Sequence, residues 1–478
     1  MSSKPVAVDY VQLRAILPPP QVCVLVHTRR SRLLALILLT LASTEFVFRG
    51  PVRFFTEGFA WNDFIAPFVQ TRLWLSGSDP YSPKELVRAW PADAVQFSFL
   101  KNDLADGTLV AKRGVPSPYP PSTFALLTPL AHLSWRAAHI ALLVLMLVSV
   151  AMILCAAMSL AQIRSIHRRA LLMAITLALA PLHTAIATGN IALPAFACGI
   201  GGLWMETRLR PYLAGILIAV SACLKPPIGL VFLAYYFFRC EWRVVLTTAA
   251  AGAAVLAVSV GRMMNHTRWL GSYMTDSASL FGIGAINDFT TANPLHFQLV
   301  NLQGPLFSLL GTASAANVFA RMIAAVLFVL WIGFSLRERR TDNPLLMLST
   351  LTIIAMLPIY HRFVDAVVIV LPLCWAFSQT GDVIRRTRLA VSLCIAPFLV
   401  PGAAILSTAA SQHWIPRSMT MSAWWQAVIL SYQVWAIFGL ALILLAAMAQ
   451  EASTQQLRKP PAAAPMRNFE EGFRKAKR

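Results

Sequence analysis

Long apolar runs, separated by short polar segments, follow one another from Leu33 to Ala449. Many of them approach the roughly 20 residues that an α-helix needs to cross a bilayer. The short segments of alternating hydrophobicity that a transmembrane β-barrel requires are absent from the sequence. The pattern therefore predicts an all-α, polytopic integral membrane protein with about twelve transmembrane helices. The predicted spans are 33–49, 137–161, 170–187, 190–206, 211–224, 226–238, 244–261, 316–336, 344–359, 364–379, 389–409 and 424–449.

Clusters of arginine give these spans an orientation. Arg29, Arg30 and Arg32 stand just before the first span, and the cytoplasmic loops of membrane proteins carry an excess of lysine and arginine. Later clusters lie at 164–169, 208–210, 239–243, 337–340, 385–388 and 459–478. With twelve spans every cluster falls on the same side of the membrane, so both termini are expected in the cytoplasm.

This orientation divides the chain into a cytoplasmic segment (1–32), a transmembrane domain (33–449) and a basic cytoplasmic tail (450–478). The tail contains "KPPAAAP" and many charges, which predicts disorder. The first apolar run begins only after 32 residues and is followed by no small-residue cleavage pattern, so we expect an uncleaved first helix rather than a signal peptide.

The composition agrees with a membrane protein. Of 478 residues, 57% are apolar and only 13% are charged, against roughly 25% charged residues in soluble proteins. The net charge of +20 raises the possibility of nucleic-acid binding, but the basic residues lie in short clusters between apolar runs, and no nucleic acid is expected as a partner. The cysteines sit mainly in apolar runs and form no CxxC pair, so neither disulfides nor a metal site are predicted.

Several polar features are expected together on the outer side. They are the loop 50–120 with Asp63, the Gly189-Asn190 turn, the loop 262–315 and the turn at His361. Lys225 joins them if 211–224 and 226–238 are separate short spans, because a proline-interrupted pair at membrane depth commonly marks a binding site. "FIAPFVQTRLWLSG" after Asp63 is too short to span and predicts an interfacial helix on the outer leaflet. The stretch 119–135 predicts either a re-entrant segment or a second surface helix.

Five stretches, in order from about residue 60 to 372, resemble one known family. They are "NDFIAPFVQTRLWLSGSDPY", with Gly77, Pro80 and Tyr81, then "YPPSTFALLTPLAHL", "GNIALPAF", "GILIAVSACLKPPIGLVF" and "YHRFVDAVVIVLP". Together they are similar to glycosyltransferase family 87, the polyprenol-phosphate-mannose-dependent mannosyltransferase type of the GT-C superfold. Two features depart from the family pattern: Asn190 stands where glutamine is more usual, and the charged insert 82–118 is long.

The resemblance implies transfer of a sugar from a lipid phosphate to an acceptor hydroxyl with inversion. Such a reaction needs a base on the face opposite the departing phosphate. Asp63, an isolated carboxylate beside a short helix at headgroup depth, is the candidate base. Capping of the helix that starts at Phe64 is the structural alternative, and one residue could serve both purposes.

Cationic groups must meet the lipid phosphate. His361 and Arg362 lie at an outer turn where excess positive charge is not expected from orientation, and Lys225 is an intramembrane cation followed by two prolines. A structural role for His361 and snorkelling of Lys225 to a nearby surface are the alternatives. Asp365, one helical turn after His361, is expected to orient that ring.

Three more residues are candidates for substrate binding: Asn190 and Tyr81 from the family-like motifs, and Asn301 in "LHFQLVNLQGPL". An ordinary polar loop is the simpler interpretation of Asn301. Because no DxD-like acidic pair occurs in the first outer loop, no metal is expected, and no other cofactor is implied.

These observations favour an inverting membrane hexosyltransferase of the cell envelope. Its expected partners are a polyprenyl-phosphate sugar donor, with mannose as the first candidate, a glycan or glycolipid acceptor, and the bilayer. Its expected location is the bacterial inner (cytoplasmic) membrane, with the active site facing the periplasm. Use of another polyprenyl-phosphate sugar is an alternative within this class. A secondary transporter or lipid flippase and a structural scaffold are alternatives from other classes, although no pair of related halves is visible in the sequence.

Overall fold

A computed structural model describes residues 20–56, 62–92, 94, 96–98, 110–112, 117–264, 268–337, 343–379 and 383–458. The first 19 residues, the segments 99–109 and 113–116 of the long insert, and the tail from 459 onward lie outside the described residues. The described chain is helical, as predicted, apart from one short antiparallel pair in which β1 (Gln96–Ser98) lies against β2 (Val110–Lys112).

Five helical stretches among the described residues are long and apolar enough to cross a membrane. They are α1 (Pro20–Val47), which continues through η2 (Phe48–Val52) into α2 (Arg53–Thr56), and α6 (Trp135–Leu160), α12 (Trp242–Met263), α15 (Ala313–Arg337) and α21 (Tyr432–Arg458). This confirms a polytopic membrane protein.

Two bent helix pairs raise the number of candidate spans in the described part of the chain to seven. The pair α7 (Ile166–Ala178) and α8 (Ala180–Ala187) is bent by 50°, and α18 (Val383–Ile395) with η5 (Ala396–Phe398) is bent by 41° against α19 (Gly402–Ser411). Each break lies next to a proline, which removes a helical hydrogen bond and disfavours helix in the preceding residue.

Five of the predicted spans correspond to shorter helices. They are α9 (Ala192–Glu206), α10 (Pro211–Leu224), α11 (Pro226–Phe238), α16 (Pro344–Ala355), and η4 (Phe363–Ile369) with α17 (Val370–Ser378). At about 1.5 Å per residue, such helices are shorter than the hydrocarbon core of a bilayer. The count of twelve spans therefore stays a prediction.

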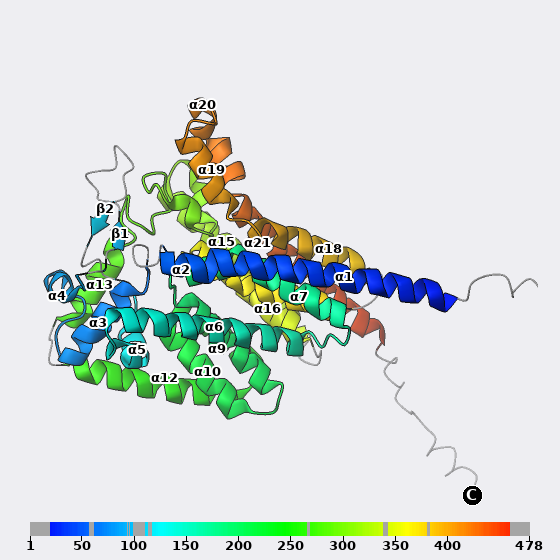
Figure 1. The fold of residues 1–478 in the computed structure, drawn as a ribbon, viewed down its shortest axis with the longest axis horizontal. Coiled ribbons are helices and arrows are strands. Elements are labelled where there is room, and N and C mark those ends of the chain that lie inside the picture. The colour runs from blue at the N-terminus through cyan, green and yellow to red at the C-terminus, as the bar shows by residue number, and fades with distance from the viewer. Residues whose placement is uncertain are drawn as a thin grey trace, which may run out of the picture.

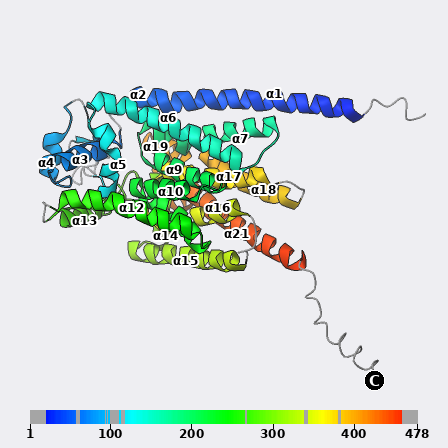
Figure 2. The ribbon, with the colours of Figure 1, turned by 90° about the horizontal axis from the view of Figure 1, so that it is seen from below.

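The remaining short elements connect these helices. They are α3 (Ile65–Ser76), α4 (Pro83–Ala89), α5 (Pro121–Ala131), α13 (Trp269–Ser279), η3 (His296–Gln298), α14 (Gln303–Leu310), α20 (Arg417–Thr420) and η6 (Trp425–Leu430). In Figure 1, α3, α4, α5, α13 and the β1–β2 pair gather at one end of the molecule, whereas α1 begins and α21 ends at the opposite end. Figure 2 shows α1 along one edge and α15 along the other, with α9, α10, α16 and α17 between them.

The helix after Asp63 differs from its prediction. Most of α3 is buried, including the polar Gln70 and Thr71, so it is not a helix that lies freely on the outer leaflet. Gln70 bonds with the Ser117 side chain, and Thr71 donates to the Pro67 carbonyl at 2.6 Å. Because these polar groups are satisfied inside the protein, α3 can pack in the interior against α5.

The break between α10 and α11 depends on close helix packing. Lys225 has extended backbone angles (φ −147°, ψ 91°), as expected for a residue that precedes proline. Four residues later, a Cβ atom on Gly229 would lie only 2.1 Å from the Ala222 backbone nitrogen. Only glycine allows α11 to approach the end of α10 this closely, and the approach holds Lys225 between the two helices.

Candidate functional site

Asp63 is fixed at the start of α3 by the turn that joins α8 to α9. Its backbone N–H donates to the Thr188 carbonyl at 2.8 Å, and the Asn190 side-chain amide donates to Asp63 Oδ2 at 2.8 Å. The Asn190 amide is oriented by its other end, because Oδ1 accepts the N–H of Ala192 at 2.9 Å. The Asp63 side chain is 28% exposed, so the carboxylate remains accessible.

The helix-cap interpretation of Asp63 is not what the structure shows. Phe64 is the N-terminal boundary of α3, and its N–H donates to the side chain of Asn62, at 2.7 Å, rather than to Asp63. The amide nitrogen of Asn62 lies 2.9 Å from Nδ1 of His139. Gly189, at φ 65°, packs against Asn62, where an added Cβ would lie 2.7 Å from Asn62 Oδ1. Asn62 therefore shapes the turn and leaves the Asp63 carboxylate to other contacts.

Lys225 points into the protein. Its ammonium lies 2.5 Å from Asp365 Oδ1 and 3.5 Å from Asn190 Oδ1, and the lysine and aspartate side chains are 8% and 2% exposed. A buried charge is costly unless it is paired, and within membranes such pairs commonly mark functional sites. The contacts contradict the alternative of a lysine that snorkels to the surface.

Asp365 holds three groups at once. Besides Lys225, its carboxylate accepts the backbone N–H of Arg362 at 3.1 Å and lies 3.3 Å from Nδ1 of His361. This contact is the expected arrangement of an acid that orients an imidazole one turn away. The other ring nitrogen of His361, Nε2, is buried and has no hydrogen-bond partner within the described chain.

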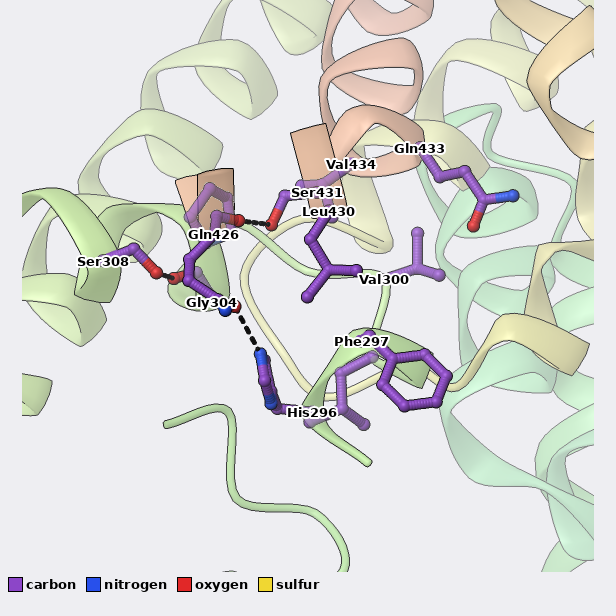
Figure 3. A pocket seen from close by; sticks show the side chains of 12 residues that line it. His296, Phe297, Val300, Gly304, Ser308, Gln426, Leu430, Ser431, Gln433 and Val434 are labelled. Atoms are coloured by element: carbon purple, nitrogen blue, oxygen red, sulfur yellow. Dashed lines mark hydrogen bonds between the residues drawn. The ribbon is translucent and has the colours of Figure 1, made fainter. Parts of the chain in front are cut away.

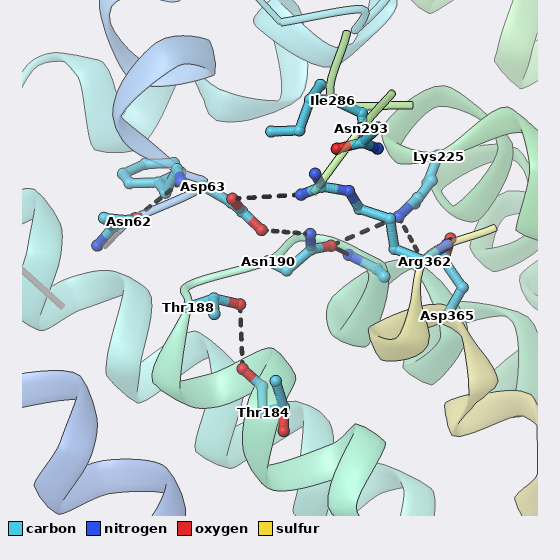
Figure 4. A network of polar contacts seen from close by, with 12 residues as sticks. Asn62, Asp63, Thr184, Thr188, Asn190, Lys225, Ile286, Asn293, Arg362 and Asp365 are labelled. Carbon is cyan, nitrogen blue, oxygen red and sulfur yellow. Dashed lines mark hydrogen bonds and ion pairs between the residues drawn. The ribbon is translucent and has the colours of Figure 1, made fainter. Parts of the chain in front are cut away.

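Arg362 completes a closed set of contacts, which we call the polar ring: Asp63, Asn190, Lys225, Asp365 and Arg362. The Arg362 guanidinium lies 4.0 Å from Asp63 Oδ1, too far for a direct hydrogen bond. Figure 4 shows the side chains of the ring meeting from the start of α3, the α8–α9 turn, the α10–α11 break and η4. Asp63, Lys225 and His361 are therefore joined through shared contacts, as parts of one site.

A sequence model of a known family covers the middle of this site. The glycosyltransferase family 87 model matches residues 118–359, just over half of the chain. The chain belongs to glycosyltransferase family 87. The matched residues include Asn190 and Lys225, whereas Asp63 and His361 lie outside them. No curated protein and no solved structure gives a significant match.

Membership in this family makes the protein a membrane glycosyltransferase, which acts on a sugar donor and an acceptor. Among the residues that the structure describes, no three histidine, cysteine, aspartate or glutamate side chains lie together as potential metal ligands. The side chains of the polar ring themselves supply carboxylates, cations and an amide.

In this glycosyltransferase, backbone hydrogen bonds join the His361 turn to the segment that precedes α14. Leu299 pairs with Arg362 in an isolated β-bridge, and the Val300 N–H donates to the His361 carbonyl at 2.8 Å. Asn301 follows, and its Oδ1 accepts the Gly304 N–H at 3.3 Å at the start of α14. Asn301 thus lies next to the turn but contributes no side chain to the polar ring, and its predicted substrate contact stays a prediction.

Tyr81 also lies outside the polar ring. It packs fully buried against Phe124 and Tyr273, and its hydroxyl donates to the Tyr119 carbonyl at 2.8 Å. Burial, and secondarily the nearby Tyr273 and Asp79, raise the pKa of Tyr81 far above its ordinary value. The predicted contact of Tyr81 with substrate stays a prediction, and the observed contact positions Tyr119.

Two tyrosines near the polar ring were missed by the sequence reasoning. Burial, together with the neighbouring Tyr360 and the Asp63 carboxylate, raises the pKa of Tyr119 well above its usual value. Burial also raises the pKa of Tyr360, against the opposing charge of Lys225. Both phenols are therefore neutral donors within electrostatic range of the ring. Tyr119 opens a family-like motif and Tyr360 precedes His361, which is the signal that could have identified them.

A hollow lies beside the site, between the segment 296–308 on one side and η6 with the start of α21 on the other (Figure 3). His296 lines it, and both ring nitrogens have partners: Nδ1 lies 2.7 Å from the Asn293 carbonyl and Nε2 lies 2.9 Å from Gln426 Oε1. No residue of the polar ring lines this hollow.

Proposed function

We propose that this glycosyltransferase moves a sugar, with mannose as the first candidate, from a polyprenyl-phosphate donor to a hydroxyl of a glycan or glycolipid. The proposed location is the bacterial inner membrane, with a GT-C arrangement of about twelve spans and the site at the periplasmic face. The observation that carries the proposal is the polar ring. In a family 87 chain, it holds the partly exposed Asp63 carboxylate near the buried Lys225 ammonium and the partly exposed Arg362 guanidinium.

Asp63 is the proposed base. The acceptor hydroxyl gives its proton to the Asp63 carboxylate while its oxygen forms a bond to the anomeric carbon of the sugar. The bond between that carbon and the phosphate oxygen breaks, its electron pair stays on the phosphate, and the polyprenyl phosphate leaves. Attack from the face opposite the phosphate inverts the configuration. The hydrogen bond from Asn190 fixes one carboxylate oxygen, which favours orientation of the other toward the acceptor.

His361, Arg362 and Lys225 are the cationic groups proposed to stabilise the phosphate. Arg362 lies 4.0 Å from Asp63, so its donors are not committed to a short hydrogen bond there. The buried Nε2 of His361 has no partner among the described residues and can donate to a phosphate oxygen when the ring is protonated. Lys225 does not contact the phosphate directly in this proposal. Its ammonium contacts Asp365 and Asn190, and it adds positive charge to the site from that position. Charge that develops on the leaving phosphate is best stabilised by donors already in place.

Asn190, Tyr81 and Asn301 have supporting parts in this proposal. Asn190 orients the base. Tyr81 holds the main chain at Tyr119. Asn301 anchors the segment that pairs with the His361 turn.

The outward orientation rests on the arginine clusters and on the arrangement of the elements. The short helices α3, α5 and α13 gather at the end of the molecule opposite to the start of α1, where arginines precede the first span (Figure 1). Cytoplasmic placement of the arginine-rich side puts these short helices on the outer face. A donor carried by a lipid can then approach the site within the membrane.

Transfer with purified protein is the decisive test of this function. The protein is reconstituted in liposomes with polyprenyl-phosphate mannose and an envelope glycolipid extract, and labelled product is followed. We expect wild-type transfer, loss of transfer in Asp63→Asn, and release of polyprenyl phosphate in step with product. Transfer from another polyprenyl-phosphate sugar alone would replace mannose as the donor sugar. Absence of transfer from every polyprenyl-phosphate sugar would overturn the proposal and leave a glycosyltransferase with another class of donor.

A further inference from the structure

A buried histidine contacts the turn that carries the candidate base. His139, on α6, is 0% exposed, and its ring stacks on that of Phe54 in α2, with 3.9 Å between the centroids and 17° between the planes. It lies in one of the candidate membrane spans, where a polar side chain is costly and commonly has a function. The proposed transfer reaction uses no atom of His139, so its role needs another explanation.

The hydrogen bonds around His139 fix its tautomer. Asn62 Oδ1 accepts the Phe64 N–H at 2.7 Å, so the amide nitrogen of Asn62 is the group that faces His139 Nδ1, at 2.9 Å. An amide nitrogen only donates, so Nδ1 accepts and the ring proton lies on Nε2. Nε2 lies 3.4 Å from the Phe54 carbonyl, to which it donates. The neutral ring therefore joins α2 to the turn before α3.

One face of α6 holds both sequence neighbours of Asp63. Trp135 lies one helical turn before His139, and its ring stacks on that of Phe64, with 6.3 Å between the centroids and 18° between the planes. Phe64 and Asn62 are both buried. Trp135 therefore fixes the residue after Asp63, and His139 fixes the residue before it. The Asp63 side chain between them stays 28% exposed.

Asn62 also contacts the turn on the other side of the base. A Cβ atom on Gly189 would lie only 2.7 Å from Asn62 Oδ1, so the α8–α9 turn packs directly on the Asn62 side chain. That turn supplies the Thr188 carbonyl and the Asn190 amide, which bond the Asp63 backbone and carboxylate at 2.8 Å each. A shift of Asn62 would therefore move both the Asp63 backbone and the turn that holds its carboxylate.

We infer that His139 is a positioning residue for the proposed base. It orients the Asn62 side chain, and through Asn62 it sets the direction of the Asp63 carboxylate toward the acceptor hydroxyl. His139 itself contacts neither substrate nor the transferred proton, and the inference rests on the proposed role of Asp63. Because a misplacement of about 1 Å can cost about 10²-fold in rate, the Asn62–His139 bond is expected to affect turnover more than substrate binding.

Two substitutions of His139 separate its two hydrogen bonds. In His139→Asn the side-chain oxygen can take the place of Nδ1 and accept from Asn62, whereas the longer side chain of His139→Gln places its amide near the Phe54 carbonyl. We expect His139→Gln to lower kcat by about 10–100-fold and to change the KM of the donor by less than about twofold. His139→Asn is expected to keep kcat within about threefold of wild type. Rescue by the shorter amide alone is not expected of a residue that only fills space.

Asn62→Ser tests the same bond from its other end. Serine can still accept the Phe64 N–H, as it does at helix N-caps, but it is too short to reach His139. This variant is expected to lose as much kcat as His139→Gln. The double variant should lose no more than either single variant, because the two residues act as a unit. Additive losses would contradict the inference.

Ile153→Ala is the control for a loss of stability alone. Ile153 is fully buried on α6, about 20 Å from His139 along the helix axis at 1.5 Å per residue. The substitution leaves a cavity, so the melting temperature should fall. The kcat of the folded protein should remain close to wild type.

Hydrogen exchange follows the turn without any transfer reaction. Deuterium uptake by residues 62–68 of the full-length protein in detergent reports on the N–H groups of Asp63 and Phe64, which are bonded in the folded protein. Faster uptake is expected in His139→Gln, and wild-type uptake in His139→Asn and Ile153→Ala. Wild-type uptake in His139→Gln would show that His139 does not hold the turn, and would overturn the inference.

The kinetic outcomes distinguish this inference from the proposed function. If Asp63→Asn loses transfer but His139→Gln and Asn62→Ser retain it, the base is retained and the positioning role is overturned. If Asp63→Asn retains transfer, the proposed base is overturned and the positioning role with it. Equal losses of kcat and of melting temperature in His139→Asn and His139→Gln would assign His139 to the fold alone. If His139→Gln does not fold, Asn62→Ser decides.

Discussion

The side chain of Asn190 lies between the candidate base and the buried lysine, with its amide nitrogen 2.8 Å from Asp63 Oδ2 and its oxygen 3.5 Å from Lys225 Nζ. Asn190 follows Gly189 in the turn between α8 and α9, and its oxygen also accepts the N–H of Ala192. An amide can face an anion with one end and a cation with the other, which a carboxylate or an ammonium cannot do.

Replacement of Asn190 by aspartate tests this arrangement. A second carboxylate beside Asp63 favours protonation of one of the two at neutral pH. If Asp63 is the base, the ionised form then requires a higher pH, so the acid limb of the pH–rate profile moves upward and transfer at pH 7 falls. Asn190→Gln, which keeps the amide, is the control and is expected to retain the wild-type profile. An unchanged acid limb in Asn190→Asp would remove Asp63 from the proton-transfer step.

Variants of the Lys225–Asp365 pair distinguish a structural role of these two residues from a catalytic one. Lys225→Met leaves a buried carboxylate without its main partner, which is expected to cost about 3–5 kcal/mol of stability. The double variant Lys225→Met/Asp365→Asn removes both charges and is expected to recover most of this loss. Thermal unfolding in detergent measures the effect.

Activity of the double variant then decides whether the Lys225–Asp365 pair takes part in the reaction. Loss of a donor to the transition state commonly costs about 10²–10³ in rate. We expect this loss to persist in the double variant although its stability is restored. A stable double variant with wild-type turnover would show that the pair serves the fold alone.

The residues of the site were largely identifiable from the sequence, whereas their contacts were not. Asp63, Lys225 and His361 stand out because polar groups in apolar surroundings are costly unless they serve a purpose. Yet Asn190 is separated from Asp63 by 127 positions, and Asp365 from Lys225 by 140. Pairing over such separations is set by helix packing, which hydropathy does not encode. Asn62 was missed for the same reason, since its contact with His139 links α6 to the turn before α3.

The helices could be predicted from the sequence as apolar segments. The positions where they break, and whether a short helix is buried, could not. The predicted span 170–187 is divided at Leu179, where Pro181 follows, and the predicted span 389–409 is bent near Pro401. The helix α3 was expected at the membrane surface because its segment is too short to span the membrane. It is buried because Gln70 and Thr71 find partners inside the protein. Hydropathy alone does not distinguish a satisfied polar side chain from a solvated one.

The raised pKa of Asp276 predicts that the stability of the folded protein depends on pH, independently of catalysis. It lies on α13, outside the candidate spans, where burial, and secondarily Asp79, raise its pKa to about 6. A carboxyl whose pKa is raised by folding binds more protons in the folded state, so stability is highest below about pH 4 and falls as the pH rises through about 6. Asp276→Asn should therefore melt above wild type at pH 7, and the difference should disappear near pH 4. A constant difference across this range would contradict the assignment.

The orientation in the membrane can be tested at exposed positions. Ile283, after α13, is 78% exposed, and Leu209, between α9 and α10, is 91% exposed. In a cysteine-free background, an impermeant maleimide added to spheroplasts should label Ile283→Cys and should label Leu209→Cys only after lysis. Both side chains are exposed in turns between helices, so the comparison reports the side of the membrane on which each turn lies. Labelling of Leu209→Cys in intact spheroplasts would reverse the proposed topology and place the polar ring on the cytoplasmic side.

Asp63→Asn is the most specific test of the proposed chemistry. Asparagine keeps the shape of the side chain and leaves the turn intact, because the N–H of Phe64 is bonded to Asn62 and the backbone of residue 63 to Thr188. It cannot accept the acceptor proton, so transfer is expected to fall by about 10²–10⁴-fold. Donor binding and thermal stability should remain close to wild type.

Asp79→Asn is the matched control for this variant. Asp79 is also an aspartate of the loop 50–120, but its oxygens accept the Tyr81 N–H at 3.0 Å and the Ser272 hydroxyl at 3.4 Å, contacts that asparagine can keep in part. It lies outside the polar ring, so its variant should transfer at close to the wild-type rate. Equal activity of both variants would exclude Asp63 as the base, because a carboxylate that accepts a proton in the rate-limiting step cannot be replaced by an amide without loss. Equal inactivity would instead trace the loss to the fold of the loop 50–120, which a lowered melting temperature in both variants would reveal.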